Sequence, residues 1–308
     1  AEWEYSFHPN HRLQAGLNYT RHLANVDGYH SPNRQQRRFA VFASSHNQWF
    51  GRRLHSLVAI RQEWYDHQIA PLIPSLSGSW HFSQTLSIRA QIAGLFRIPT
   101  LNDLYWIPGG NPALKPEHGI STELAVDKQV QLNRISIKSS LGAFANSIKN
   151  RILWEPGNSF WQPSNLNRVL SRGTELNIDV QVKQAIAVWK LVLNAQYLVS
   201  GESKTGQTFW DKPEFQLIYT PSLLASGLIE YRINKLAVYV QGSFTGSRYT
   251  RSDNTHSLPA YFIADAGIQY EFPFKETPIY LCLTKHTKLP FGDLCHFGHG
   301  LQAFNFKS

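Results

Sequence analysis

The chain has 308 residues, a formal net charge of +9 at pH 7, two Cys and no Met. No stretch approaches the roughly 18 apolar residues that a membrane-spanning helix needs, so a helical membrane protein is excluded. Lys and Arg are scattered along the chain, so the positive charge does not indicate a nucleic-acid partner.

Alternation of apolar and polar residues with a period of two dominates the sequence. Leu176, Ile178 and Val180 alternate with Asn177, Asp179 and other polar residues, and the same pattern recurs at 189–200 and 262–271. This pattern predicts strands with one apolar and one polar face. About fifteen strands are expected, most of them of bilayer-crossing length, at 2–7, 12–22, 37–47, 52–65, 72–81, 86–96, 120–129, 134–148, 168–183, 186–200, 223–233, 236–249, 260–272, 278–284 and 297–306.

The expected connections alternate between short and long. Short turns are expected at 9–10, 83–84, 130–131, 184–185, 234–235 and 273–277, and long loops at 24–36, 97–119, 149–167, 201–222 and 250–259. A soluble sandwich gives no reason for this alternation, whereas an outer-membrane barrel joins its strands by tight periplasmic turns and long extracellular loops. The fold class predicted is therefore all-β, a transmembrane antiparallel up-and-down β-barrel. We expect the aromatic residues near strand ends to belong to interfacial aromatic girdles, with ordinary core aromatics as the alternative; they are Trp189, Tyr197, Tyr239, Tyr249, Tyr261, Phe262 and Tyr270.

The stretch 96–117 is the most distinctive connection. Its prolines and glycines, among them Pro99, Pro108, Gly109 and Pro116, predict a stiff, shaped loop rather than regular helix or central strand. It resembles a signature of TonB-dependent outer-membrane receptors in two linked halves. The first half comprises Phe96, Arg97, Pro99, Thr100, Leu101, Asn102, Leu104 and Tyr105, and the second Gly110, Asn111, Pro112, Leu114, Lys115, Pro116 and Glu117.

The resemblance, strongest to the cobalamin and siderophore branch, implies a barrel of about 22 strands that encloses an N-terminal plug. Residues 1–308 would then supply about fifteen C-terminal strands of that barrel, as a mature or truncated piece that lacks the plug and the first strands. The function implied is energised import of a scarce nutrient, namely a ferric siderophore, cobalamin or haem. The partners implied are outer-membrane lipid, the nutrient and the TonB complex acting through the plug, with a monomeric receptor and no cofactor.

A second candidate site lies in the next long connection. Trp154, Trp161 and Asn165 occupy a loop shaped by Pro and Gly, and two Trp side chains there would suit stacking on a flat ligand. Packing of one loop on another is the competing interpretation. Catalytic and metal-binding motifs are absent from the sequence, so we do not expect an enzyme.

The C-terminal region departs from the family pattern. It lacks the family's motifs before the closing strand, and the Phe pair of the final strand, Phe304 and Phe306, is displaced by one residue. These departures favour an altered reading frame between about 276 and 299. The sequence leaves open whether Cys282 and Cys295 form a disulfide.

Two other functions share the strand pattern. A passive porin or adhesin barrel would lack the signature, and a soluble all-β binding domain would bury the apolar faces in a sealed core.

Overall fold

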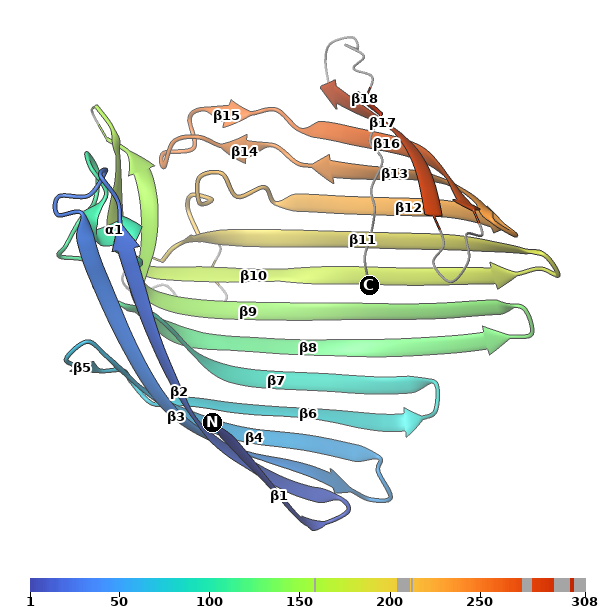
Figure 1. Ribbon diagram of the computed structural model, residues 1–308, viewed down its shortest axis with the longest axis horizontal. Coiled ribbons are helices and arrows are strands. Elements are labelled where there is room, and N and C mark those ends of the chain that lie inside the picture. The colour runs from blue at the N-terminus through green and yellow to red at the C-terminus, as the bar shows by residue number, and fades with distance from the viewer. Residues whose placement is uncertain (158, 204–210, 212, 273–278, 291–299, 302–308) are drawn as a thin grey trace.

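A single antiparallel sheet of 16 strands makes up nearly all of the computed structural model, which describes residues 1–157, 159–203, 211, 213–272, 279–290 and 300–301. Except for the two-residue β5, which pairs with β4, the strands follow each other in chain order (Figure 1). They are β1 (Glu2–His8), β2 (His11–Asn25), β3 (Asn33–Trp49), β4 (Leu54–Tyr65), β5 (Gln68–Ile69), β6 (Ile73–Ser83), β7 (Leu86–Arg97), β8 (Glu117–Leu132), β9 (Ile135–Pro156), β10 (Trp161–Lys183), β11 (Ala187–Glu202), β12 (Leu223–Ile233), β13 (Leu236–Thr245), β16 (Tyr261–Phe272), β17 (Ile279–Pro290) and β18 (Gly300–Leu301). This is the predicted up-and-down arrangement.

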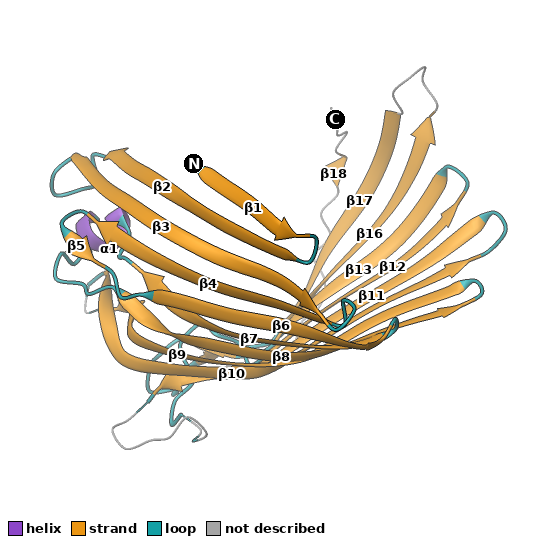
Figure 2. Cartoon of the chain, turned by 90° about the horizontal axis from the view of Figure 1, so that it is seen from below, coloured by secondary structure: helices purple, strands orange, loops and turns teal. Residues whose placement is uncertain are grey.

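The sheet is curved like an open trough (Figure 2), and its two edge strands, β1 and β18, do not pair with each other in the described part of the chain. Its apolar face remains open to the surroundings: Leu176, Trp189 and Leu193 are 38%, 43% and 41% exposed. A soluble domain would cover such a face, because each buried Leu or Trp side chain contributes about 2 kcal/mol. The exposed face fits the wall of a membrane barrel and excludes a sealed core among the described strands.

The polar face lines the hollow of the trough. A cavity of about 620 Å³ lies against it, lined by polar residues of seven strands from β1 to β8, including Glu4, His46, Arg89 and Glu123. The same side chains form cross-strand ion pairs, for example Arg89 with Asp127 at 2.6 Å. The polar side is thus the inner face and the apolar side the outer face.

Aromatic residues mark the two edges of the outer face. Trp189 pairs in register with Tyr231 beside a short turn, and Tyr197 lies eight residues further along the same strand. Eight residues span about 27 Å along a strand, or about 21 Å across a bilayer at the usual tilt. The predicted placement was wrong for Tyr239 and Tyr261, which lie on the inner face because they alternate with the outward Val238 and Phe262.

Most predicted connections match the structure, and four differ from it. The long loop expected at 24–36 is shorter, because β2 continues to Asn25 and β3 begins at Asn33. The turn expected at 130–131 lies at Asn133, whose positive φ of 44° suits a tight turn. The long loop expected at 149–167 is instead the tip of a hairpin, because β9 and β10 stay paired out to Pro156 and Trp161. The loop at 246–260 contains a small ribbon of β14 (Arg248–Tyr249) and β15 (Ser257–Leu258).

The stretch 96–117 is not wholly irregular, contrary to the prediction. One turn of helix, α1 (Leu101–Tyr105), lies between Pro99 and Pro108, and a capping box starts it. The Thr100 hydroxyl accepts a hydrogen bond from the Asp103 backbone N–H, and the Asp103 carboxylate accepts one from the Thr100 N–H. This reciprocal pair stabilises the helix start despite the nearby prolines. Across the described residues, no helix has the length and apolar character to span a membrane.

Several C-terminal predictions lie outside the described residues. They include the turn at 273–277, Cys295 and most of the strand expected at 297–306, of which β18 covers Gly300–Leu301. The altered reading frame between 276 and 299 stays a prediction.

Candidate functional site

The signature loop, residues 97–117, links the ends of β7 and β8 at the edge of the sheet that carries the long connections. Arg97 and Glu117 are register partners at this edge. Loops of outer-membrane barrels at such an edge face the cell exterior. The contacts of the loop therefore decide the shape of the extracellular opening of the barrel, which we call the outer mouth.

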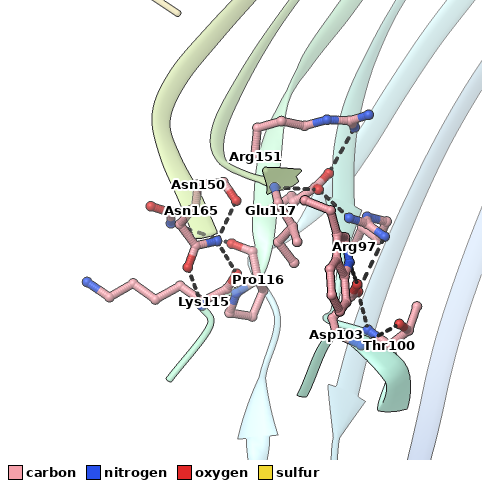
Figure 3. A network of polar contacts seen from close by, with 11 residues as sticks. Arg97, Thr100, Asp103, Lys115, Pro116, Glu117, Asn150, Arg151 and Asn165 are labelled. Carbon is pink, nitrogen blue, oxygen red and sulfur yellow. Dashed lines mark hydrogen bonds and ion pairs between the residues drawn. The ribbon is translucent and has the colours of Figure 1, made fainter. Parts of the chain in front are cut away.

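Glu117 is the electrostatic centre of the loop (Figure 3). Its side chain is only 5% exposed, and it accepts hydrogen bonds from Arg97 Nη2 at 2.5 Å, Arg151 Nη1 at 3.1 Å and the Ile152 backbone N–H at 2.9 Å. A buried carboxylate is tolerated only when its charge and lone pairs are matched in this way. The hydrogen bond to Glu117 raises the pKa of Arg97 above its usual value, against the opposing effect of burial. Glu117 thus joins β8 to the strands on both sides of it.

Asp103 is a second buried carboxylate, and it connects α1 to the β9–β10 hairpin. Its Oδ2 accepts the Thr100 N–H at 2.8 Å, and its Oδ1 accepts the indole N–H of Trp154 at 2.9 Å. Arg97 Nη1 lies 3.9 Å from the same carboxylate. Arg97 therefore links the two buried carboxylates, Glu117 and Asp103. The Trp154 indole is engaged in a hydrogen bond within the protein.

Asn165 anchors the second half of the loop to β10. Its side chain accepts from the Lys115 N–H at 2.8 Å and donates to the carbonyls of Lys115 and Asn150 at 3.0 and 2.8 Å. Nearby, Asn111 Nδ2 donates to the Pro163 carbonyl at 3.3 Å. Gly109 packs so tightly that a Cβ there would lie 2.0 Å from the Trp161 carbonyl oxygen. The loop therefore contacts the β9–β10 hairpin at several points, from Asp103 to Lys115.

The opposite side of the loop contacts the tip of the β2–β3 hairpin. Tyr29 forms a β-bridge with Trp106, and its hydroxyl donates to Asn102. The Ile107 N–H donates to the Gly28 carbonyl at 2.8 Å, and the Arg34 guanidinium lies 4.0 Å from the centre of the Tyr105 ring. The signature loop therefore fixes two outer hairpins, β2–β3 and β9–β10, that lie far apart in the sequence.

The candidate ligand residues separate into two kinds. Trp154 and Asn165 are engaged in the contacts described above, whereas Trp161 is 43% exposed and its ring lies 5.6 Å from that of Tyr219.

The remaining signature residues lie around α1 and at the ends of β7 and β8. Leu114 is buried, Phe96 packs against the Tyr65 ring, and Pro112 and Lys115 are exposed. For the three candidate ligand residues, Trp154, Trp161 and Asn165, contact with a ligand stays a prediction.

Sequence reasoning missed several members of this network. Asp103 was recognisable from the capping pattern Thr100-x-x-Asp103. Arg151, Asn150 and Tyr29 had no local signal, because their partners lie 34 to 73 residues away. In the described part of the chain, no group of three or more His, Cys, Asp or Glu side chains is arranged to hold a metal ion.

A curved wall with an apolar outside, a polar inside and a braced outer mouth defines an outer-membrane barrel protein. The family model "TonB dependent receptor-like, beta-barrel" matches residues 1–284, and the chain belongs to this family.

Two sequence relatives are vitamin B12 transporters. The chain is 26% identical over 200 residues to a vitamin B12 transporter BtuB of Photobacterium profundum, covering 63% of this chain and 30% of that protein. It is 37% identical over 83 residues to a vitamin B12 transporter BtuB of Vibrio vulnificus, covering 26% of this chain and 13% of that protein. The chain therefore spans less than a third of the length of these relatives.

Solved structures share the fold. The ferric enterobactin receptor PfeA in complex with BCV-L6 superimposes with a TM-score of 0.69 at 18% identity, over 94% of this chain and 48% of that one. The FrpB iron transporter of Neisseria meningitidis gives a TM-score of 0.65 at 12% identity, over 96% and 52% of the two chains. The sheet described here corresponds to about half of each receptor.

Proposed function

We propose that this chain forms the barrel wall and the outer loops of an outer-membrane receptor that imports a scarce nutrient by TonB-dependent transport. The observation that carries the proposal is the braced outer mouth, in which one loop fixes two hairpins through two buried carboxylates, Glu117 and Asp103. A passive pore needs no such rigid mouth, whereas a receptor that captures a dilute ligand gains affinity when its binding loops are pre-organised.

Cobalamin is the nutrient we propose first, since the named sequence relatives are vitamin B12 transporters. A ferric siderophore is the alternative, suggested by the named structural neighbours, and haem remains in the same chemical class of large metal chelates. The energy-coupling partner would be TonB, acting through a plug domain in the complete receptor.

Trp161 is the residue that we propose as a ligand contact. It is exposed beside Tyr219 on the outer edge of the hairpin, and an aromatic pair offers a flat apolar surface. Trp154 and Asn165 would act mainly by holding the hairpin that presents Trp161.

The test measures binding of cyanocobalamin and of ferric enterobactin to the detergent-solubilised receptor that carries this chain, followed by uptake in cells. We expect saturable binding of one of the two and uptake that stops when the proton-motive force is collapsed. Trp161→Ala should weaken binding about 3- to 10-fold, the contribution of one aromatic stack, whereas Trp189→Ala, at the opposite edge of the sheet, should not. Size-dependent solute leakage through proteoliposomes without saturable binding would support a passive pore and contradict the proposal.

A further inference from the structure

Three neighbouring outer connections meet beside the aromatic pair of Trp161 and Tyr219. They are the tip of the β9–β10 hairpin, the segment 213–222 before β12, and the loop at 246–260, whose ribbon of β14 and β15 lies at the same edge of the sheet (Figure 1). Trp161 comes from the first connection and Tyr219 from the second, and their rings lie 5.6 Å apart. The third connection holds the second in place through hydrogen bonds to its backbone.

Asn254 makes the central contact of the third connection. Its Oδ1 accepts a hydrogen bond from the Gln216 N–H at 2.8 Å, and its Nδ2 donates to the Gln216 carbonyl at 2.9 Å. One side chain thus satisfies both backbone groups of Gln216, as a neighbouring strand would. Asn254 has a φ of 56°, a left-handed conformation that Asn adopts more readily than most residues, and its own N–H closes a turn by donating to the Arg251 carbonyl at 3.0 Å. The turn therefore presents the amide to Gln216.

Gln216 is also held by β11. Its Oε1 accepts from the Ser200 N–H at 2.9 Å, and the N–H of the next residue, Leu217, donates to the Ser200 carbonyl at 2.8 Å. The Gln216 Nε2 donates to the Thr220 carbonyl at 3.2 Å. The segment around Gln216 is therefore fixed between β11 and Asn254.

Tyr219, three residues further on, has a backbone conformation that its residue type disfavours. Its φ of 54° lies in the left-handed region, which is unfavourable for a bulky side chain. The Tyr219 N–H donates to the Tyr249 carbonyl of β14 at 2.8 Å, and the preceding Ile218 is buried. Such conformations persist only where surrounding contacts hold them, and they concentrate at functional sites. The Tyr219 ring is nevertheless 45% exposed, so the fixed backbone presents the ring to the outside.

We infer that Asn254 is a positioning residue of the nutrient site and that Tyr219 is a second ligand contact. By fixing Gln216, Asn254 keeps the Tyr219 backbone in its left-handed conformation and the Tyr219 ring beside Trp161. Two rings held in place offer a flat ligand a pre-organised surface, and affinity rises because the ligand does not have to order the loop. The inference rests on the proposed function and adds to it the third connection on which the aromatic surface depends.

The experiment compares variants of the complete, detergent-solubilised receptor. Asn254→Gly removes the amide but keeps a residue that adopts a left-handed φ freely. Tyr219→Ala removes the ring, and a double variant carries both changes. The matched control is Asn234→Gly, because Asn234 also has a left-handed φ, of 49°, but lies in the short turn between β12 and β13 at the opposite edge of the sheet. Calorimetry measures binding of cyanocobalamin and of ferric enterobactin, and mass spectrometry measures amide hydrogen exchange of the segment 213–222 in the ligand-free receptor.

We expect Tyr219→Ala to weaken nutrient binding about 3- to 10-fold, the contribution of one aromatic contact. Asn254→Gly should weaken binding by up to the same factor, and the double variant should bind no more weakly than Tyr219→Ala, because both residues act through one ring. Amide exchange in 213–222 should become about 10-fold faster in Asn254→Gly, since both hydrogen bonds to the Gln216 backbone are lost. Asn234→Gly should change neither binding nor exchange in this segment.

The outcomes separate the inference from the proposed function. Additive losses in the double variant would mean that Asn254 does not act through Tyr219, and would overturn the inference. Saturable binding that Asn254→Gly leaves unchanged would also overturn it, while the proposed function would stand. If the unmodified receptor bound neither nutrient, the proposed function would fail and the inference would fail with it.

Discussion

Glu117 offers the sharpest test of the braced outer mouth. Glu117→Gln keeps an oxygen that can accept the Ile152 N–H but removes the charge that Arg97 and Arg151 bind. Those two side chains are 44% and 42% exposed, so they can turn toward solvent and recover part of the lost interaction. Losing the charge-assisted bonds should lower the free energy of unfolding by about 2 kcal/mol. Glu117→Ala also leaves the Ile152 N–H without its acceptor, and should cost about 4 kcal/mol.

The assay is urea unfolding of the detergent-folded receptor, followed by tryptophan fluorescence. Glu123→Gln is the matched control, because Glu123 lies on the same strand and face but is 48% exposed and 3.7 Å from Arg89. Exposed pairs contribute at most about 1 kcal/mol, so the control should change stability little. If both Glu117 variants unfold as the control does, the network does not brace the mouth and the reasoning is refuted.

Three further changes probe the same mouth. Asn165→Ala should lower the free energy of unfolding by about 2 kcal/mol and speed proteolytic cleavage within 108–116, because three hydrogen bonds disappear; Asn167→Ala, on an exposed neighbour, should do neither. Gly109→Ala should destabilise the receptor by about 1 to 3 kcal/mol in the same urea assay, since its Cβ would meet a backbone carbonyl. Gly142→Ala, where the nearest atom is 3.6 Å away, is its neutral control. Trp154→Phe removes one half-buried indole donor and should lower the melting temperature by a few degrees, for about 1 kcal/mol lost. An unchanged melting temperature would contradict the role given to that bond.

The strands were predictable because a membrane barrel imposes the same local rule on each of them. Leu176 and Asn177 must face opposite sides whatever the rest of the chain does, so a window of ten residues carries the signal. Tyr239 shows the limit of this reasoning. Its aromatic side chain suggested a place in a girdle on the outer face. Its position in the alternation of apolar and polar residues puts it on the inner face instead, and this alternation determines which face a side chain occupies.

The extension of β9 and β10 beyond the bilayer was not predictable from local sequence. Pro156, Gly157 and Pro163 suggested a loop, yet the strands remain paired there because the signature loop packs against them. Pro163 is fully buried, and its carbonyl accepts from Asn111. Contacts across some fifty residues supply this stability, and no short window contains them.

The signature residues were recognisable as a set, while their physical roles were not. The sequence indicated that Arg97 and Glu117 belong to one motif, but it did not reveal that Glu117 is buried and receives Arg151 as well. Likewise, Trp154 suggested ligand stacking from its residue type, whereas its indole N–H donates to Asp103, the residue that completes the capping box of α1.

The most direct test of the central claim measures which face of a strand touches lipid. Nitroxide labels are placed one at a time at positions 174 to 181 of β10, in a receptor with Cys282 and Cys295 replaced by Ala and reconstituted in bilayers. We expect the labels at the even positions, such as Leu176, to collide with oxygen dissolved in the lipid, and those at the odd positions, such as Asn177, to collide with a water-soluble nickel chelate. Labels shielded from both reagents, or accessibility without alternation, would contradict a membrane-barrel wall.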